Sequence, residues 1–108
     1  MKQYQTITIK RGATFSYLGT ISLPAGVWTA QAQIRNAAGE LVDSFVVVIT
    51  PPLAPSVLHG ISLYVPASST VTWPIATLLS DIKFTDAAGF VLYGETFAIT
   101  IEKAETSV

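Results

Sequence analysis

Among the one histidine and seven acidic residues of this sequence, the types that enzymes most often use for proton transfer, two positions stand out: His59 and Asp81. His59 is the only histidine, and it precedes Gly60 at the start of a predicted strand. A histidine that acts as a general base needs a second side chain to orient it and a pocket that holds substrate. No serine or aspartate stands at a recognisable motif spacing from it. The pattern therefore predicts a solvent-exposed histidine at the start of a strand.

Asp81 lies in an apolar setting, with Leu78-Leu79 before it and Ile82 after it. Such a setting raises the pKa of a carboxyl group, as a catalytic acid requires. An aspartate of this kind more often faces away from a sheet or accepts hydrogen bonds from loop amides. We therefore expect a structural role for Asp81. A small enzyme built around Asp81 and His59 stays open as an alternative, which replacement of both residues by alanine would test.

The composition offers no pattern for metal or cofactor chemistry. The chain has no cysteine, which excludes disulfides, thiolate metal sites and thiol nucleophiles. One histidine and dispersed carboxylates do not form a metal-binding cluster or a glycosidase pair. The seven glycines are scattered and do not form a phosphate-binding loop. The sequence predicts no catalytic residue, no metal site and no cofactor, and a protein that is not an enzyme.

The aromatic residues divide into an inward and an outward set. Trp28 and Trp73 fall on the inward parity of their predicted strands, which favours core filling over a sugar-stacking platform. Tyr64 and Tyr4 fall on the outward parity. We expect these two tyrosines to contact a partner.

The elements that position these side chains are short strands. Two segments share one plan, in which an alternating strand runs into an Asn/Asp-Ala-Ala-Gly turn at Asn36–Gly39 and at Asp86–Gly89. Asparagine or aspartate starts such a turn by bonding its own backbone, and glycine supplies the positive φ that closes it. Each segment predicts a β-hairpin. With about eight short strands and a turn every ten or so residues, the chain is expected to be all-β, a two-sheet antiparallel β-sandwich.

Two further segments complete this outline. Val71 and Trp73 alternate as in a strand, and Trp73–Leu79, with proline at its second residue, is compatible with one or two helical turns. Pro51–Pro55 holds three prolines and predicts a stiff connector between two hairpin-containing halves. Neither half could bury a core alone, so residues 1–108 are expected to form a single domain. The predicted core consists of Ile7, Ile9, Phe15, Trp28, Ile34, Phe45, Val47, Ile61, Leu63, Trp73, Ile82, Phe84, Phe97, Ile99 and Ile101.

The charge content bears on possible partners. Charged residues make up 12% of the chain, about half the usual share, and the net charge is −1. This balance gives no electrostatic footprint for nucleic acid or for an anionic membrane. The start of the sequence lacks the apolar stretch of a secretory signal, and its longest aliphatic and aromatic run, Phe45–Ile49, is too short to span a bilayer. We expect a soluble protein made in the cytoplasm, with neither nucleic acid nor membrane as a partner.

Phe45–Ile49 also interrupts the alternation of its strand. Apolar residues on both faces fit a central strand covered on both sides, or a strand whose outer face meets a partner. A chain with so few charges has much uncharged surface, which another copy or another protein would cover.

Several segments from Thr6 onward share a pattern with one family of proteins: Ile9–Phe15, Leu23–Trp28, Asp81–Phe84, Asp86–Gly89, Thr96–Ile101 and Thr106. In these segments the sequence resembles small structural proteins of tailed bacteriophages and prophages, above all the N-terminal domain of phage baseplate upper proteins. Ala13 stands where that family usually has aspartate. The resemblance implies an immunoglobulin-like sandwich that assembles into virion rings or trimers, with no catalytic residues.

These observations lead to one functional hypothesis and one principal alternative. The hypothesis is a non-catalytic assembly module of a phage or prophage virion, made in the bacterial host cytoplasm, which contacts identical copies and other virion proteins. The first interface candidates are Val46, Val48, Tyr64 and Tyr4. The alternative is a module that binds carbohydrate or a cell surface, as in a receptor-binding or adhesin domain, and it predicts solvent-exposed tryptophans.

Overall fold

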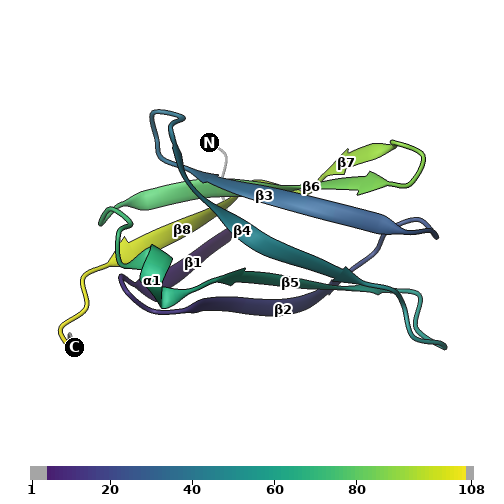
Figure 1. Ribbon diagram of the computed structural model, residues 1–108, viewed down its shortest axis with the longest axis horizontal. Coiled ribbons are helices and arrows are strands. Elements are labelled where there is room, and N and C mark those ends of the chain that lie inside the picture. The colour runs from purple at the N-terminus through teal and green to yellow at the C-terminus, as the bar shows by residue number, and fades with distance from the viewer. Residues whose placement is uncertain (1–4, 107–108) are drawn as a thin grey trace.

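The computed structural model describes residues 5–106, which form eight strands and one short helix (Figure 1). The predicted all-β class is confirmed. The helix α1 spans Ala67–Thr70, between β5 and β6. The strands are β1 (Gln5–Lys10), β2 (Phe15–Ile21), β3 (Trp28–Arg35), β4 (Leu41–Thr50), β5 (His59–Val65), β6 (Thr77–Asp86), β7 (Val91–Tyr93) and β8 (Phe97–Glu102).

All eight strands belong to one continuous sheet. Its order is β1-β8-β6-β3-β4-β5-β2, and β7 pairs with β6 beside this path. The neighbouring strands are antiparallel except β1 and β8, which run parallel from Gln5↔Phe97 to Lys10↔Glu102. The expected two-sheet antiparallel arrangement is therefore not confirmed: the sheet is mixed, and it is rolled rather than divided.

The roll turns at β4, an interior strand of the sheet that has β3 on one side and β5 on the other. The first part of β4, Leu41–Phe45, pairs with β3, whereas Val46–Thr50 pairs with β5. A strand that passes from one layer to the other in this way makes a corner. In Figure 1, β3 and β6 form the upper layer, β5 and β2 form the lower layer, and β4 crosses between them. The strand order ends at β1 on one side and at β2 on the other, so the roll is nearly a barrel.

Both predicted hairpin turns are present. In the β3–β4 turn, Asn36 Oδ1 accepts hydrogen bonds from the backbone N–H groups of Ala38 and Glu40, and Gly39 has a φ of 84°. In the β6–β7 turn, Asp86 Oδ1 likewise accepts hydrogen bonds from the backbone N–H groups of Ala88 and Phe90, and Gly89 has a φ of 88°. The shared sequence plan therefore produces a shared turn structure.

The core lies between the two layers of the roll, and every residue of the predicted core contributes to it. Ten of these residues are buried, whereas Ile7, Ile9, Val47, Ile82 and Phe97 are partly buried and pack against the others. The cluster of buried side chains also contains three residues that the sequence does not predict to be in the core: Leu23, Val65 and Leu78. Ala32 on β3 joins them, and it faces Phe45 across the β3–β4 pair.

The segment around Trp73 differs from both expectations. Val71 and Trp73 lie in a turn rather than a strand, and β6 begins at Thr77, where helical turns had been an option. The helix forms earlier, at Ala67–Thr70, with Pro66 as its N-cap residue. Proline is compatible with the start of a helix because its missing N–H would be unpaired there. From Thr77 onward the chain is instead held in β6 by pairing with β3 and β8.

Candidate functional site

The outer surface of the lower layer carries exposed apolar residues of three neighbouring strands, β2, β5 and β4. Alternation along β2, β5 and β4 sends every second side chain outward, and register aligns them in rows such as Val46↔Tyr64↔Ser16 and Val48↔Ser62↔Leu18. We call this surface the β2–β5–β4 face. It consists of Ser16, Leu18, Thr20, Val46, Val48, Thr50, Gly60, Ser62 and Tyr64.

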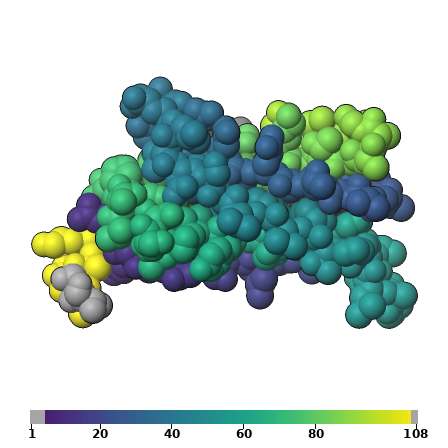
Figure 2. Space-filling model, in the orientation of Figure 1, coloured from purple at the N-terminus to yellow at the C-terminus, as the bar shows by residue number. Residues whose placement is uncertain are grey.

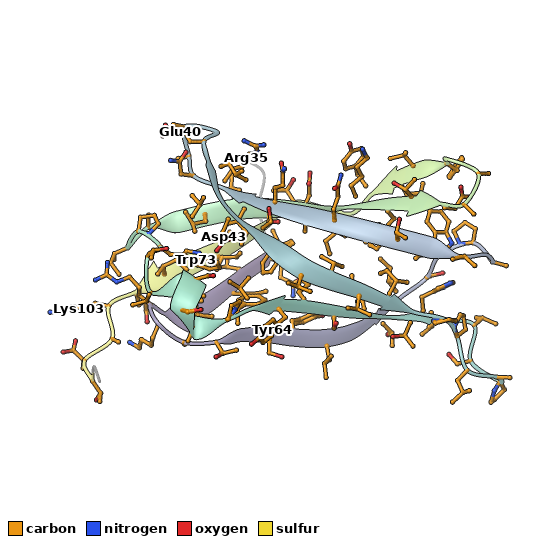
Figure 3. All side chains as sticks on the ribbon, in the orientation of Figure 1. Arg35, Glu40, Asp43, Tyr64, Trp73 and Lys103 are labelled. Atoms are coloured by element: carbon orange, nitrogen blue, oxygen red, sulfur yellow. The ribbon has the colours of Figure 1, made fainter. Side chains whose placement is uncertain are left out.

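Three of the four predicted interface candidates fall within the described residues, and all three lie on this face. Val46 is 57% exposed, Val48 53% and Tyr64 43%. Tyr64 lies on the lower layer in Figure 3. Of the two options for the apolar run Phe45–Ile49, the structure supports an outer face that is open: Phe45, Val47 and Ile49 contribute to the core, while the two valines between them face out. Tyr4 lies outside the described residues.

The face contains no charged side chain. Leu18 is its most exposed apolar member, 78% exposed, and it is not among the interface candidates that the sequence predicts. A further feature of the sequence could have located the face: no Asp, Glu, Lys or Arg occurs from Ser44 to Ser80. That span supplies most of β4 and all of β5. A surface that combines exposed apolar side chains with an absence of charge is typical of the central part of a protein interface.

The prediction for His59 is wrong. Its side chain is only 2% exposed and is enclosed at the start of β5, where Ile21 of β2 lies opposite it. Nε2 lies 3.4 Å from the carbonyl oxygen of Gly26, and Nδ1 is buried without a hydrogen-bond partner. The residue before a glycine at the start of a strand can face either way, and the inward parity of Ile61 and Leu63 extends back to His59.

Asp81 faces away from the core, which is one of the two structural roles that the sequence predicts for it. On β6 it is paired with Gln33 of β3, and its neighbours Ser80 and Leu78 point into the core. It lines a shallow depression together with Arg35 and Asn36. The sheet order places β3 and β4 between β6 and β5, so the structure does not bring Asp81 and His59 together. An enzyme built on this pair has no joint site.

Both tryptophans are buried, as predicted. Trp28 is 5% exposed and donates its indole N–H to the carbonyl oxygen of Pro24 at 2.8 Å. Trp73 is 1% exposed and donates to Asp43 Oδ2 at 2.9 Å, and the two residues lie side by side in Figure 3. Neither ring can stack on a sugar, so the carbohydrate-binding alternative has no tryptophan platform.

Residues 5–106 also bear on two other features, metal-binding clusters and membrane-spanning helices. The described part of the chain holds no group of three or more histidine, cysteine, aspartate or glutamate side chains arranged to bind a metal ion. Within the same residues, α1 is the only helix, and it is neither long nor apolar enough to cross a bilayer.

Comparisons with known proteins add no relative. No protein-family model matches the chain, and no curated protein matches it. The resemblance to phage structural proteins therefore stays a prediction, and the functional argument rests on the surface of the molecule.

Proposed function

We propose that this chain is a non-catalytic assembly module that binds identical copies of itself and neighbouring proteins through the β2–β5–β4 face. The observation that carries this proposal is the exposure of Leu18, Val46, Val48 and Tyr64 on a surface without charge. Burial of apolar surface against a partner is favourable because it removes that surface from water. The cores of protein interfaces are depleted in charged residues, as this face is, and its one aromatic residue, Tyr64, is of a type that interfaces favour.

The module belongs, in this proposal, to the virion of a tailed phage or prophage, in a tail, baseplate or head-associated part. The sequence resemblance is its support, and a low-charge face suits repeated packing of copies in a ring. The proposal includes that the rolled sheet is a variant of the immunoglobulin-like sandwich. Its support is the two-layer arrangement around β4, since strands that change layers occur in sandwich folds.

The dimensions of the face predict a weak contact. Three strands about 4.8 Å apart, each contributing about five residues of 3.4 Å, cover roughly 250 Å². A stable complex buries about 800 Å² of each partner. The face alone is smaller than this, so association of the isolated chain is expected only at high concentration. In a particle, repetition of the contact would strengthen it through effective concentration.

The test is solution mass by light scattering over a wide concentration range. The wild-type chain is expected to rise from its monomer mass of 11.5 kDa to a defined multiple. A variant with Val46→Lys and Val48→Lys is expected to remain at the monomer mass, because association would bury two unpaired charges. Both positions are exposed, so the substitutions should leave folding intact.

The matched control adds the same two charges to the outer surface of β3. Thr29→Lys and Gln31→Lys change exposed positions of the upper layer, and this variant should associate like the wild type. A wild-type chain that stays monomeric at every concentration would contradict self-assembly, as would equal loss of association in both variants.

The virion assignment has a test of its own. Tailed particles purified from the strain that carries the gene are expected to contain the chain at a fixed ratio to the other structural proteins, measured by mass spectrometry. Particles that lack it would contradict the assignment and leave the self-association result unaffected.

A further inference from the structure

The roll has an apolar cleft where it fails to close. Strands β1 and β2 are the two ends of the sheet order and are joined by the short turn 11–14. The cleft, of roughly 230 Å³, lies between the early part of β1 and the later part of β2. It is therefore on the side where the two strands diverge from their turn. Its lining includes Ile7, Tyr17, Ile21, Ile82, Phe84 and Phe97.

This cleft explains an incomplete part of the core. Ile7, Ile21, Ile82 and Phe97 point toward the core yet remain partly exposed, and all four line the cleft. Tyr17 also has the inward parity of β2, opposite Leu63, and is 45% exposed. The core is thus open to water at one place, over side chains that elsewhere in the roll would be covered.

The same molecule carries an apolar projection. The loop Pro51–Leu58 joins β4 to β5, contains no charged residue, and every residue in it is exposed. Leu53, at 84%, is the most exposed large apolar side chain among the described residues. The loop extends past the ends of β4 and β5 at the lower right of Figure 1, and Figure 2 shows it standing clear of the body.

The loop is held in a compact form before any contact. Three of its eight residues are proline, the N–H of Ser56 donates to the carbonyl oxygen of Leu53 at 3.0 Å, and the N–H of Leu58 donates to Ser56 Oγ at 3.1 Å. A preordered segment loses little conformational entropy on binding. A stiff loop that exposes a leucine to water is therefore suited to insertion into an apolar cavity.

We propose that the loop Pro51–Leu58 of one copy docks into the β1–β2 cleft of a second copy, with Leu53 as the inserted side chain. This inference rests on the proposed self-assembly and adds a second contact to it. A cavity of about 150 Å³ lined by apolar side chains admits benzene, so the larger cleft has room for the smaller side chain of leucine. The loop brings no charge to the cleft, whose one charged lining residue is Glu95.

A second copy suits both features better than a charged partner does. The loop is uncharged, the cleft has one charged lining residue, and both expose apolar side chains to water. The loop of a given molecule does not fill its own cleft, since Leu53 stays exposed. The far end of the molecule is charged, with the Lys10–Glu102 ion pair at 3.2 Å and Arg11 beside it. Insertion of a loop into a cleft on another copy is a heterologous contact, which generates rings or filaments.

The absence of cysteine allows a direct test. Chains with Ala54→Cys, an exposed position beside the inserted Leu53, are mixed with chains that carry Gln5→Cys or Glu95→Cys, two exposed positions that line the cleft, and the mixtures are oxidised mildly. The control acceptor is Ala38→Cys, an exposed position in the β3–β4 turn. Docking raises the effective concentration of the paired thiols, so at least one cleft position should form heterodimer roughly tenfold faster than the control. An excess of the cysteine-free wild-type chain should suppress this reaction.

The outcomes separate this inference from the proposed function. Equal cross-linking rates for both cleft positions and the control would overturn the loop contact. This holds even if the Val46→Lys, Val48→Lys variant has lost self-association, a result that would support the contact through the β2–β5–β4 face alone. Rapid cross-linking that competes with wild-type chain, and that persists in the Val46→Lys, Val48→Lys background, would support the loop contact as independent of that face.

Discussion

At the scale of single residues, the least replaceable side chain is Trp73. It is almost fully enclosed, and its indole N–H has an acceptor in Asp43, which β4 turns toward the core side of the sheet. A buried indole needs such an acceptor, because an unpaired N–H in the interior is unfavourable. Trp73 lies in a turn, so its burial depends on side-chain packing and this one hydrogen bond rather than on strand pairing.

Replacement of Trp73 tests this account. Trp73→Ala is expected to lower the free energy of unfolding by about 3–5 kcal/mol, since it leaves a cavity and removes the donor to Asp43 Oδ2. Trp73→Phe keeps most of the ring volume and should cost less. Urea denaturation monitored by circular dichroism measures the free energy of unfolding of both variants. Tyr64→Ala is the comparison, because an exposed aromatic residue should change stability by no more than about 0.5 kcal/mol. Equal losses for Trp73→Ala and Tyr64→Ala would contradict the burial argument.

At the scale of elements, the short helix α1 is tied to the turn between β1 and β2. Thr70, fully buried at the end of α1, donates its hydroxyl to the carbonyl oxygen of Ala13 at 2.6 Å. The two residues are far apart in the sequence, and the bond joins the connection after β5 to the place where the two ends of the sheet meet. A four-residue helix has little stability of its own, so this contact helps to hold it.

Thr70→Val removes this hydroxyl and keeps the shape of the side chain. The carbonyl group of Ala13 then loses a partner in a partly buried setting, and we expect a loss of about 0.5–1.5 kcal/mol in the free energy of unfolding. Thr72→Val is the matched control: its hydroxyl also donates to a backbone carbonyl, that of Ser69, but it is exposed to water. Thermal denaturation of both variants gives the comparison. A Thr70→Val protein as stable as the control would show that the bond contributes nothing.

At the scale of the whole molecule, the rolled sheet has two uncovered apolar regions, the β2–β5–β4 face and the cleft between β1 and β2. If identical copies cover either one, folding and association are linked, because the partner binds only the folded chain. A protein concentration about 100-fold above the dissociation constant then adds about 2.7 kcal/mol.

The melting temperature should consequently depend on protein concentration. For a domain of about 100 residues this gain raises the melting temperature by roughly 10 °C. Scanning calorimetry over the concentration range of the light-scattering experiment measures the rise, and the Val46→Lys, Val48→Lys variant should show a smaller one. A wild-type melting temperature that does not change with concentration would argue against any contact between identical copies.

The sequence by itself determined the local structure of this protein. Alternation identified the inward residues of the strands, and the Asn/Asp-Ala-Ala-Gly plan identified both hairpins, because period-two burial and turn hydrogen bonds act over a few neighbouring residues. The same local reasoning predicted the burial of Trp28 and the outward direction of Tyr64, which the structure confirms, and left open whether the outer face of Phe45–Ile49 is covered.

Only the tertiary structure decided how these strands join. The parallel pairing of β1 with β8, the passage of β4 between two layers and the burial of His59 depend on contacts between distant segments, for which short-range pattern carries no information. The cleft has the same origin: Ile7, Ile82 and Phe97 have the pattern of core residues, and they stay partly exposed because the two ends of the sheet diverge. Closure of a rolled sheet is a property of the whole chain.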